Sequence, residues 1–294
     1  MSTTGTATPT KWKRTTQVSE GIMTEQSAYH STLIIEITEF RFRFFCENAG
    51  KCIWLEDYAS DVYLTDAEVL ENLKLLFFNH PVLSLTNWQA IHVMVSFGAF
   101  TLIPEEVFRK EYAARYLELT QGHPVLPSAK TIAQHIPRWN CYNVFEMPQI
   151  WWDFFRDQFT LRDLSFSHIS SVLVSTPPVS LDYQPMVHVC VQEQHFIATI
   201  FEGNQLILCN RFKYQNPEEA TFFYLSCLNE LGYLTQGVKL VFSGEITPFS
   251  KFYTELSKFA PEISFVKKPE HLNYPSAFED LADHRYFALL NANK

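Results

Sequence analysis

The sequence contains no run of about 18 or more apolar residues, so we expect none of its segments to span a membrane. Its first residues include no apolar stretch of the kind that forms the centre of a secretory signal. The six cysteines form no CxxC pair, and several alternate with apolar residues inside predicted strands. This pattern favours buried, reduced thiols over a disulfide framework. Together these absences predict a cytoplasmic protein.

Positive charge is also scarce. The chain has 23 Lys and Arg residues against 32 Asp and Glu residues, which gives a formal net charge of -9. A general nucleic-acid binder needs a basic face that displaces counterions from phosphates. The composition therefore argues against a nucleic acid as the partner.

Common catalytic and metal-binding motifs are missing too. The sequence has no HExxH, no GxSxG, no GxxxxGK(S/T) and no His–Cys set with the spacing of a zinc site. His92, His168, His188 and His195 lie in or beside predicted strands, where a buried structural histidine is the favoured interpretation over a ligand. We therefore predict no metal and no cofactor.

What the sequence does contain is a duplication. Residues 32–58 and 185–213 each predict three short strands joined by tight turns, because apolar and polar residues alternate in them. Each set is followed by a helix, a strand that enters a glycine-containing turn, and a second helix. A repeated βββαβα unit predicts an α/β fold of two lobes that face a cleft. The 294 residues, 47% of them hydrophobic, suffice for two such lobes.

The expected organisation follows from this repeat. We expect a flexible tail over residues 1–29, which includes the cluster Trp12-Lys13-Arg14, a first lobe over 30–178 and a second lobe over 179–294. Pro177-Pro178 marks the boundary between the lobes, because it interrupts regular structure. Helices are expected to start at Thr65-Asp66, Pro104, Pro148, Asn216-Pro217 and Thr247-Pro248, and a last one to cover residues 275–290.

Two segments add a resemblance to this order. With FTLIPEEVF at 100–108 and LVFSGEITPFSKFYTEL at 240–256, the chain over residues 30–290 resembles an uncharacterised bacterial family, the domain-of-unknown-function family numbered 3822. The resemblance implies an actin-like ATPase fold, which is ribonuclease H-like and duplicated. It implies no activity, because the family has none assigned.

The same resemblance points to the residues that would hold a nucleotide. In nucleotide-binding relatives, the first two strands of each lobe meet in a turn resembling Asp-x-Gly-(Ser/Thr), whose glycine admits phosphates and whose aspartate holds Mg²⁺. The matching first-lobe turn contains Glu36, Thr38 and Glu39, so only the acid has a counterpart.

In the second lobe the match falls on Val189 to Gln194. There Val189 replaces the acid, and Gln192, Glu193 and Gln194 form the turn without glycine. The third element, which lies against the adenosine in relatives, is reduced to Ser243-Gly244-Glu245.

These departures predict that the nucleotide machinery is degenerate, because carboxylates in both turns would repel a triphosphate. Glu36 and Glu245 are interpreted as solvated turn carboxylates. For Arg41, Arg43 and Arg211 the simplest interpretation is a solvated sheet face.

Aromatic residues crowd between the two repeats. Trp151 and Trp152 are about 100° apart on a predicted helix, so one narrow stripe cannot hold both of them together with the phenylalanines that follow. Burial between the lobes is the favoured interpretation. If the helix is exposed instead, Trp139, Trp151, Trp152 and Phe155 are the candidates for a partner surface.

The leading functional hypothesis is a non-catalytic cytoplasmic protein with a protein-interaction or scaffold role, bound to a protein partner or to a second copy of itself. The alternative is a divergent ATPase or phosphotransferase in which Glu36 and Glu245 contact metal or nucleotide. A third possibility is a small-molecule sensor that binds in the cleft without turnover.

Overall fold

The computed structural model describes residues 11–178, 184–235, 237–260 and 262–293. The strands are β1 (Lys13–Ser19), β2 (Thr32–Ile37), β3 (Arg41–Asn48), β4 (Lys51–Ala59), β5 (Ala90–Val95), β6 (Phe100–Pro104), β7 (Ala129–Ile136), β8 (Cys141–Pro148), β9 (Asp163–His168), β10 (Met186–Val191), β11 (His195–Glu202), β12 (Gln205–Lys213), β13 (Lys239–Gly244) and β14 (Glu262–Phe265). The helices are α1 (Glu25–Ala28), α2 (Asp66–Asn79), α3 (Ala113–Gln121), α4 (Gln149–Gln158), α5 (Ile169–Ser175), α6 (Pro217–Glu230), α7 (Lys251–Leu256) and α8 (Phe287–Asn291), with short 3-10 turns at Lys110–Tyr112, Pro137–Trp139 and Ser276–Phe278.

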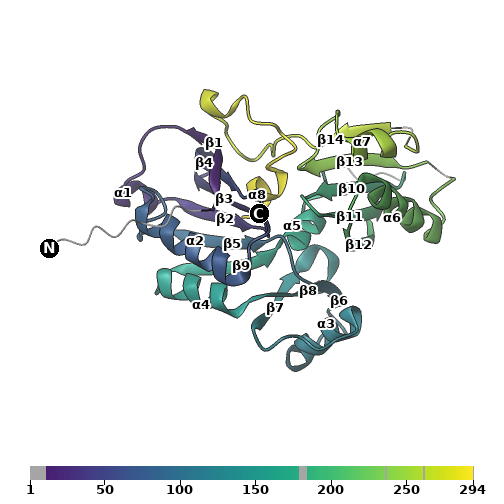
Figure 1. The fold of residues 1–294 in the computed structure, drawn as a ribbon, viewed down its shortest axis with the longest axis horizontal. Coiled ribbons are helices and arrows are strands. Elements are labelled where there is room, and N and C mark those ends of the chain that lie inside the picture. The colour runs from purple at the N-terminus through teal and green to yellow at the C-terminus, as the bar shows by residue number, and fades with distance from the viewer. Residues whose placement is uncertain (1–10, 179–183, 236, 261, 294) are drawn as a thin grey trace.

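Two sheets share one strand order. The first runs β1-β4-β3-β2-β5-β9 and the second β12-β11-β10-β13-β14, so without β1 the two orders correspond strand by strand. In each sheet, three strands form an antiparallel meander, and the first strand of the meander pairs in parallel with the next strand of the sheet. This confirms the predicted α/β fold of two actin-like lobes, which stand side by side in Figure 1.

The helices form layers around these sheets. α2 and α4 cover one face of the first sheet, and α6 and α7 cover one face of the second. Between the sheets lie α5 and α8, which share an apolar core with Ile34 and Met94 of the first sheet and Ile197 and Val241 of the second (Figure 1). The two lobes are therefore joined by a common hydrophobic core as well as by the chain.

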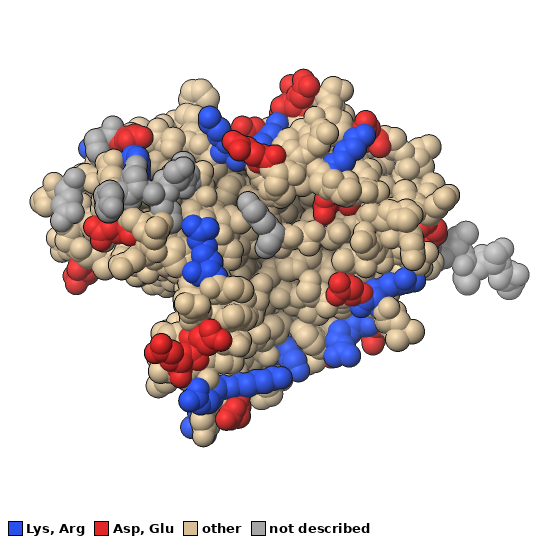
Figure 2. All heavy atoms as spheres, turned by 180° about the vertical axis from the view of Figure 1, so that it is seen from behind, with Lys and Arg blue, Asp and Glu red and all other residues tan. Residues whose placement is uncertain are grey.

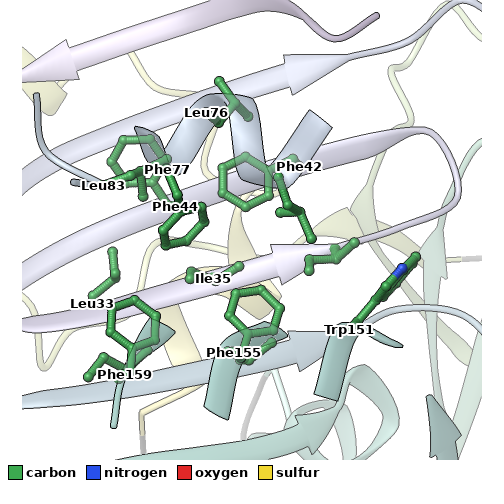
Figure 3. Close-up of a cluster of buried hydrophobic side chains, with 14 of the residues drawn as sticks. Leu33, Ile35, Phe42, Phe44, Leu76, Phe77, Leu83, Trp151, Phe155 and Phe159 are labelled. Carbon is green, nitrogen blue, oxygen red and sulfur yellow. The ribbon is translucent and has the colours of Figure 1, made fainter. Parts of the chain in front are cut away.

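The core beneath α2 and α4 is rich in aromatic side chains. Phe42 and Phe44 of β3 meet Phe77 of α2 and Phe155 of α4 in the cluster drawn in Figure 3. Alternation places these phenylalanines on one face of β3, since side chains along a strand point to opposite faces in turn. Helix α2 begins at the predicted position, where Thr65 and Glu68 form a capping box.

A third, smaller sheet of order β6-β8-β7 carries α3 beside the first sheet (Figure 1). The prediction that a helix starts at Pro104 is wrong. Pro104 is the last residue of β6, and α3 begins only at Ala113. Pairing of β6 with β8 takes the segment into a sheet, and neither strand contains a local signal for that distant partner.

Three other expectations need correction. Residues 13–19 are not a flexible tail but pair with β4, and Trp12 is 2% exposed and stacks on Phe42. Residues 1–10 of that predicted tail lie outside the described residues.

The last helix covers only Phe287–Asn291, and α7 starts at Lys251 behind its cap Ser250 rather than at Pro248. The boundary at Pro177-Pro178 stays a prediction, because residues 179–183 are not described.

Charge is dispersed on the face of the molecule drawn in Figure 2. On the face seen in Figure 2, acidic and basic side chains are interspersed and most of the area is uncharged. All six cysteines are free, four of them buried. Among the described residues, no helix combines the length and the apolar character needed to cross a membrane.

Candidate functional site

The first hairpin of each lobe ends in a turn at the cleft. In the first lobe Thr38 N donates to the carbonyl oxygen of Arg41 at 2.9 Å, and in the second Gln192 N donates to that of His195 at 2.8 Å. The Thr38 hydroxyl accepts hydrogen bonds from the backbone of Phe40 and Arg41 at 3.0 and 2.8 Å. It therefore closes its own turn.

The strand registers correct one part of the sequence comparison. Ile37 pairs with Phe42 before the first turn, and Val191 pairs with Phe196 before the second. Counting back from these pairs, the position of Glu36 corresponds to Cys190 and not to Val189. The second lobe has a thiol where the first has its cleft-facing acid.

Glu36 is buried, with 2% of its surface exposed. Its carboxylate accepts a hydrogen bond from Ser96 Oγ at 2.9 Å and lies 3.5 Å from Arg43 Nη1. Burial raises the pKa of Glu36 above its ordinary value, although Arg43 and Ser96 oppose this change. The expectation of a solvated turn carboxylate is wrong for Glu36, because the second lobe covers this face of β2.

Arg43 lies in the middle of the same face and is 1% exposed. Its Nε is 3.2 Å from Asp57 Oδ1 on β4, and its Nη2 forms an ion pair with Glu245 of the second lobe. The guanidinium also stacks over the ring of Tyr286, 5.3 Å from its centroid. A solvated face was expected here, and that expectation is wrong since β3 is an inner strand whose cleft face is covered.

Arg41 and Arg285 complete the group. Arg41 pairs with Glu193 and Glu245 across the cleft and with Asp57 at 3.2 Å in its own lobe. Arg285, which precedes α8, lies 3.1 Å from both Asp57 and Glu245. We call these seven residues the cleft cluster: Glu36, Arg41, Arg43, Asp57, Glu193, Glu245 and Arg285.

Charge within the cleft cluster is nearly balanced, with three guanidiniums against four carboxylates. Burial alone would raise the pKa of Asp57 and of Glu245, but Arg43, Arg41 and Arg285 together hold both below their ordinary values. Glu245 has only 15% of its side chain exposed, so it too is an ion-paired group and not a solvated turn carboxylate. At neutral pH both carboxylates are therefore charged and paired.

A second contact between the lobes lies beside the cleft cluster. Arg211 of β12 donates to both carboxylate oxygens of Glu39 at 3.3 and 3.4 Å and to the carbonyl of Gly98 at 3.1 Å. Arg211 has 11% of its side chain exposed, so it does not lie on a solvated face as expected. Burial lowers its pKa, and Glu39 opposes that effect.

The remaining predicted residues serve local structure. The Gln192 amide lies near Cys190 Sγ, and Gln194 is exposed. The Ser243 hydroxyl hydrogen bonds to His188 Nε2 at 2.7 Å. Gly244 has φ +85°, and a Cβ built on it would lie 2.1 Å from the carbonyl oxygen of Val191. Only glycine fits there without moving the backbone.

The four histidines singled out by the sequence are all buried, as a structural role requires. His92 bonds to the hydroxyls of Ser165 and Ser167 at 2.7 Å, and His168 to that of Ser170 at 2.7 Å. Burial lowers the pKa of His92 to about 4 and that of His168 and His188 to about 3. Within the described ranges no group of His, Cys, Asp and Glu is arranged to hold a metal ion.

Next to Glu39 and Arg211 the cleft contains a cavity of about 420 Å³. Its wall is formed by both lobes and by the small sheet, with Gly98, Glu146 and Lys213 among the lining residues. Its volume lies within the range of ligand pockets. The cleft is therefore closed by ion pairs on one side of Glu39 and open on the other.

The aromatic segment is mostly buried. Trp151 and Phe155 are 1% and 0% exposed and belong to the first core, so neither is available to a partner (Figure 3). Trp139 is half-buried and donates to the carbonyl of Val174 at 2.7 Å. Trp152 is half-buried and stacks on Phe166 with ring centroids 4.3 Å apart.

Asp57, Ser96 and Arg285 were missed by the sequence reasoning. Asp57 had a detectable signal, because an acid in an apolar strand pairs across the hairpin with Arg43 once the register is known. Arg285 had none, since it reaches the cleft only through the path of the chain before α8.

Comparison with known proteins agrees with this geometry. A family model described as "Protein of unknown function (DUF3822)" matches residues 21–263. A Bacteroides thetaiotaomicron protein with an actin-like ATPase fold and unknown function is 21% identical, with a TM-score of 0.74 over 84% of this chain and 94% of that one. A chain of a PilM-PilN type IV pilus biogenesis complex is 8% identical, with a TM-score of 0.59 over 89% of this chain and 97% of that one. No curated protein matches the sequence. These likenesses show an actin-like ATPase fold.

Proposed function

The chain belongs to the DUF3822 family of proteins of unknown function, and we propose that it is a non-catalytic cytoplasmic protein that acts by binding another protein. In this proposal the actin-like architecture is kept and the cleft no longer serves a nucleotide. The single observation that carries it is the ion pair of Arg43 with Glu245, which joins the lobes at the inner end of the cleft.

The position of the cleft cluster supports this proposal. The hairpin turns that hold phosphates in nucleotide-binding relatives present Glu39 and Glu193 here, and each carboxylate is already bound to an arginine of the opposite lobe. A nucleotide at this place would have to separate several ion pairs that are shielded from water. Removing one partner of a buried ion pair costs about 3–5 kcal/mol. The lobes are therefore held closed at neutral pH.

A protein is the partner that the comparisons favour. The pilus-biogenesis relative of the same fold was solved as a complex of two proteins, PilM and PilN. A nucleic-acid partner is disfavoured by the net charge of -9 and by the dispersed charges of the face in Figure 2. The partner is either a second copy of this chain or a different protein.

One observation favours a second candidate function. The cavity of about 420 Å³ beside Glu39 and Arg211 lies in the cleft, where a divergent ATPase or phosphotransferase would bind its ligand. A sensor of small molecules would use the same cavity.

Thermal unfolding in the presence of nucleotides separates these candidates. A ligand at 100 times its Kd stabilises the folded state by about 2.7 kcal/mol, which moves the melting temperature by several degrees. For a protein-binding role we expect no shift with millimolar ATP or ADP and Mg²⁺. A stabilisation by ATP, together with hydrolysis that is lost in Glu36→Gln, would overturn the proposal.

A further inference from the structure

Trp152 of α4 has a cationic environment. Its ring stacks on Phe166 of β9, and Lys130 Nζ lies 5.3 Å and the Arg156 guanidinium carbon 5.9 Å from a Trp152 ring centroid. Within the described part of the chain neither Lys130 nor Arg156 has an ion pair with a carboxylate. Two cations that are placed on an aromatic ring and lack an anion can accept one from outside.

Trp152, Phe166 and Arg156 border a hollow of about 330 Å³, which we call the Trp152 hollow. Its lining includes Trp152, Arg156, Leu161, Arg162 and Phe166, and it contains no carboxylate. The acids of α4 lie elsewhere, because Asp153 and Asp157 line a separate hollow beside Lys74. The helix thus separates its charges, and the Trp152 hollow is left positive in a chain of net charge -9.

Leu161 at the rim of this hollow has an unusual conformation. Its φ is +64°, in the left-handed region that bulky side chains rarely adopt, and 98% of its side chain is exposed. A glycine would satisfy this turn at lower cost and would expose no apolar surface. A fully exposed leucine on a strained turn beside this hollow offers an apolar contact to a partner.

The neighbouring strand provides a backbone for docking. β9 is the last strand of the six-stranded sheet, so its outer edge has no strand partner among the described residues. Leu164 and Phe166 of β9 turn their half-buried side chains into the Trp152 hollow. An extended peptide that pairs with this edge would place alternate side chains over the hollow.

From these observations we infer that the Trp152 hollow and the outer edge of β9 bind an extended, acidic peptide segment of a partner protein. One apolar side chain of the segment lies on Trp152 beside Leu161, and its carboxylates pair with Lys130, Arg156 and Arg162. The inference rests on the proposed protein-binding function and names the chemistry of the partner.

Other anionic partners fit less well. The patch has three cations, whereas a nucleic acid is bound through a longer row of phosphate contacts. A membrane surface would also meet the acidic groups of the neighbouring hollow, Asp153 and Asp157. A peptide satisfies the exposed leucine, the free strand edge and the local positive charge together.

Selection from a random displayed peptide library on the full-length protein tests the inference. We expect the enriched peptides to combine Asp or Glu with a bulky apolar residue and to bind more weakly as salt concentration rises. The double substitution Arg156→Glu and Arg162→Glu should raise Kd at least about tenfold, and Leu161→Gly should also raise it. Arg115→Glu, an exposed arginine of α3, is the matched control and should leave Kd unchanged.

Hydrogen exchange locates the site independently, since bound peptide should protect amides of β9. Failure to enrich peptides, enrichment of neutral or basic ones, or equal binding to the double variant would each overturn the inference. RNA or anionic vesicles that bind with the same dependence on Arg156 and Arg162 would overturn it as well. None of these results reports on nucleotide binding. The proposed function is therefore tested separately, by thermal unfolding with nucleotides.

Discussion

The two lobes have the same backbone and different charges. Their strand orders and hairpin registers correspond, so each position at the cleft has a counterpart in the other lobe. The first lobe has Arg43 where the second has Ile197, and Asp57 where the second has Arg211. Glu245 of the second lobe corresponds to Ser96 of the first.

This difference shows how a duplicated fold becomes a closed unit. The buried cation Arg43 and the partly buried cation Arg41 come from the first lobe. Two of the acids that neutralise them, Glu193 and Glu245, come from the second. These three ion pairs all run from one lobe to the other. The comparison therefore predicts that the lobes unfold together, as one cooperative unit.

Acidification should produce the largest effect, and it tests what the lobes share. His92 and His168 in the first lobe and His188 in the second have pKa values of about 3–4 when folded, below the ordinary value near 6.5. Because the unfolded chain binds these protons first, stability is complete above about pH 6.5 and falls as the pH decreases towards 4. Burial also lowers the pKa of His195 in the second lobe. Four such groups give a slope of about 5 kcal/mol per pH unit, seen as a falling urea midpoint.

One carboxyl group reduces this slope. The pKa of Glu36 is raised in the folded protein, so the folded state binds this proton before the unfolded state does. This one proton partly offsets the loss of stability on acidification. His188→Gln should reduce the slope by about a quarter. A urea midpoint that stays constant from pH 8 to pH 5 would contradict the assignment of buried neutral histidines to both lobes.

Arg43→Ile removes the central charge difference between the lobes, because it gives the first lobe the residue that the second has at this position. The substitution leaves Glu36, Asp57 and Glu245 without their shared buried cation, and we expect the free energy of unfolding to fall by about 3–5 kcal/mol. Urea denaturation measures it. Arg14→Ile is the control, since Arg14 is half exposed and its pair with Glu56 at 3.6 Å should contribute less than about 1 kcal/mol. Equal stability of the Arg43 variant and the wild type would show that the cleft cluster does not hold the lobes together.

The same comparison explains how much of the fold could be predicted. Strands β2, β3, β10 and β11 were predictable because alternation is a local signal, and α2 because Thr65 and Glu68 form a capping box. The small sheet was not, because Pro104 followed by two glutamates also fits a helix start, and only pairing of β6 with the distant β8 decides between them.

The candidate site shows the same limit. Thr38, Glu39, Gln192 and Glu193 were correctly assigned to turns, since hairpin ends are read from neighbouring residues. The solvated interpretation of Arg41 and Arg43 was wrong, because alternation says which side chains share a face but not what covers that face. Only the opposite lobe, more than 150 residues away along the chain, makes this face an interior.

The smallest expected effect concerns Gly244, where the backbones of the two lobes differ. The first lobe has Val95 at the corresponding register, paired with Ile37, whereas Gly244 pairs with Val191 at φ +85°. In Gly244→Ala the methyl group would lie 2.1 Å from the carbonyl oxygen of Val191, so β10 and β13 have to separate or the turn has to change.

We expect Gly244→Ala to lower the free energy of unfolding by about 3 kcal/mol, through the left-handed backbone and the backbone clash together. Gly203→Ala separates these two causes, because Gly203 has φ +52° and open space around its Cβ position. Strain alone should cost that variant about 1 kcal/mol. If the two variants have the same urea midpoint, close packing of β10 on β13 contributes nothing, and the second lobe had no need of a glycine where the first has valine.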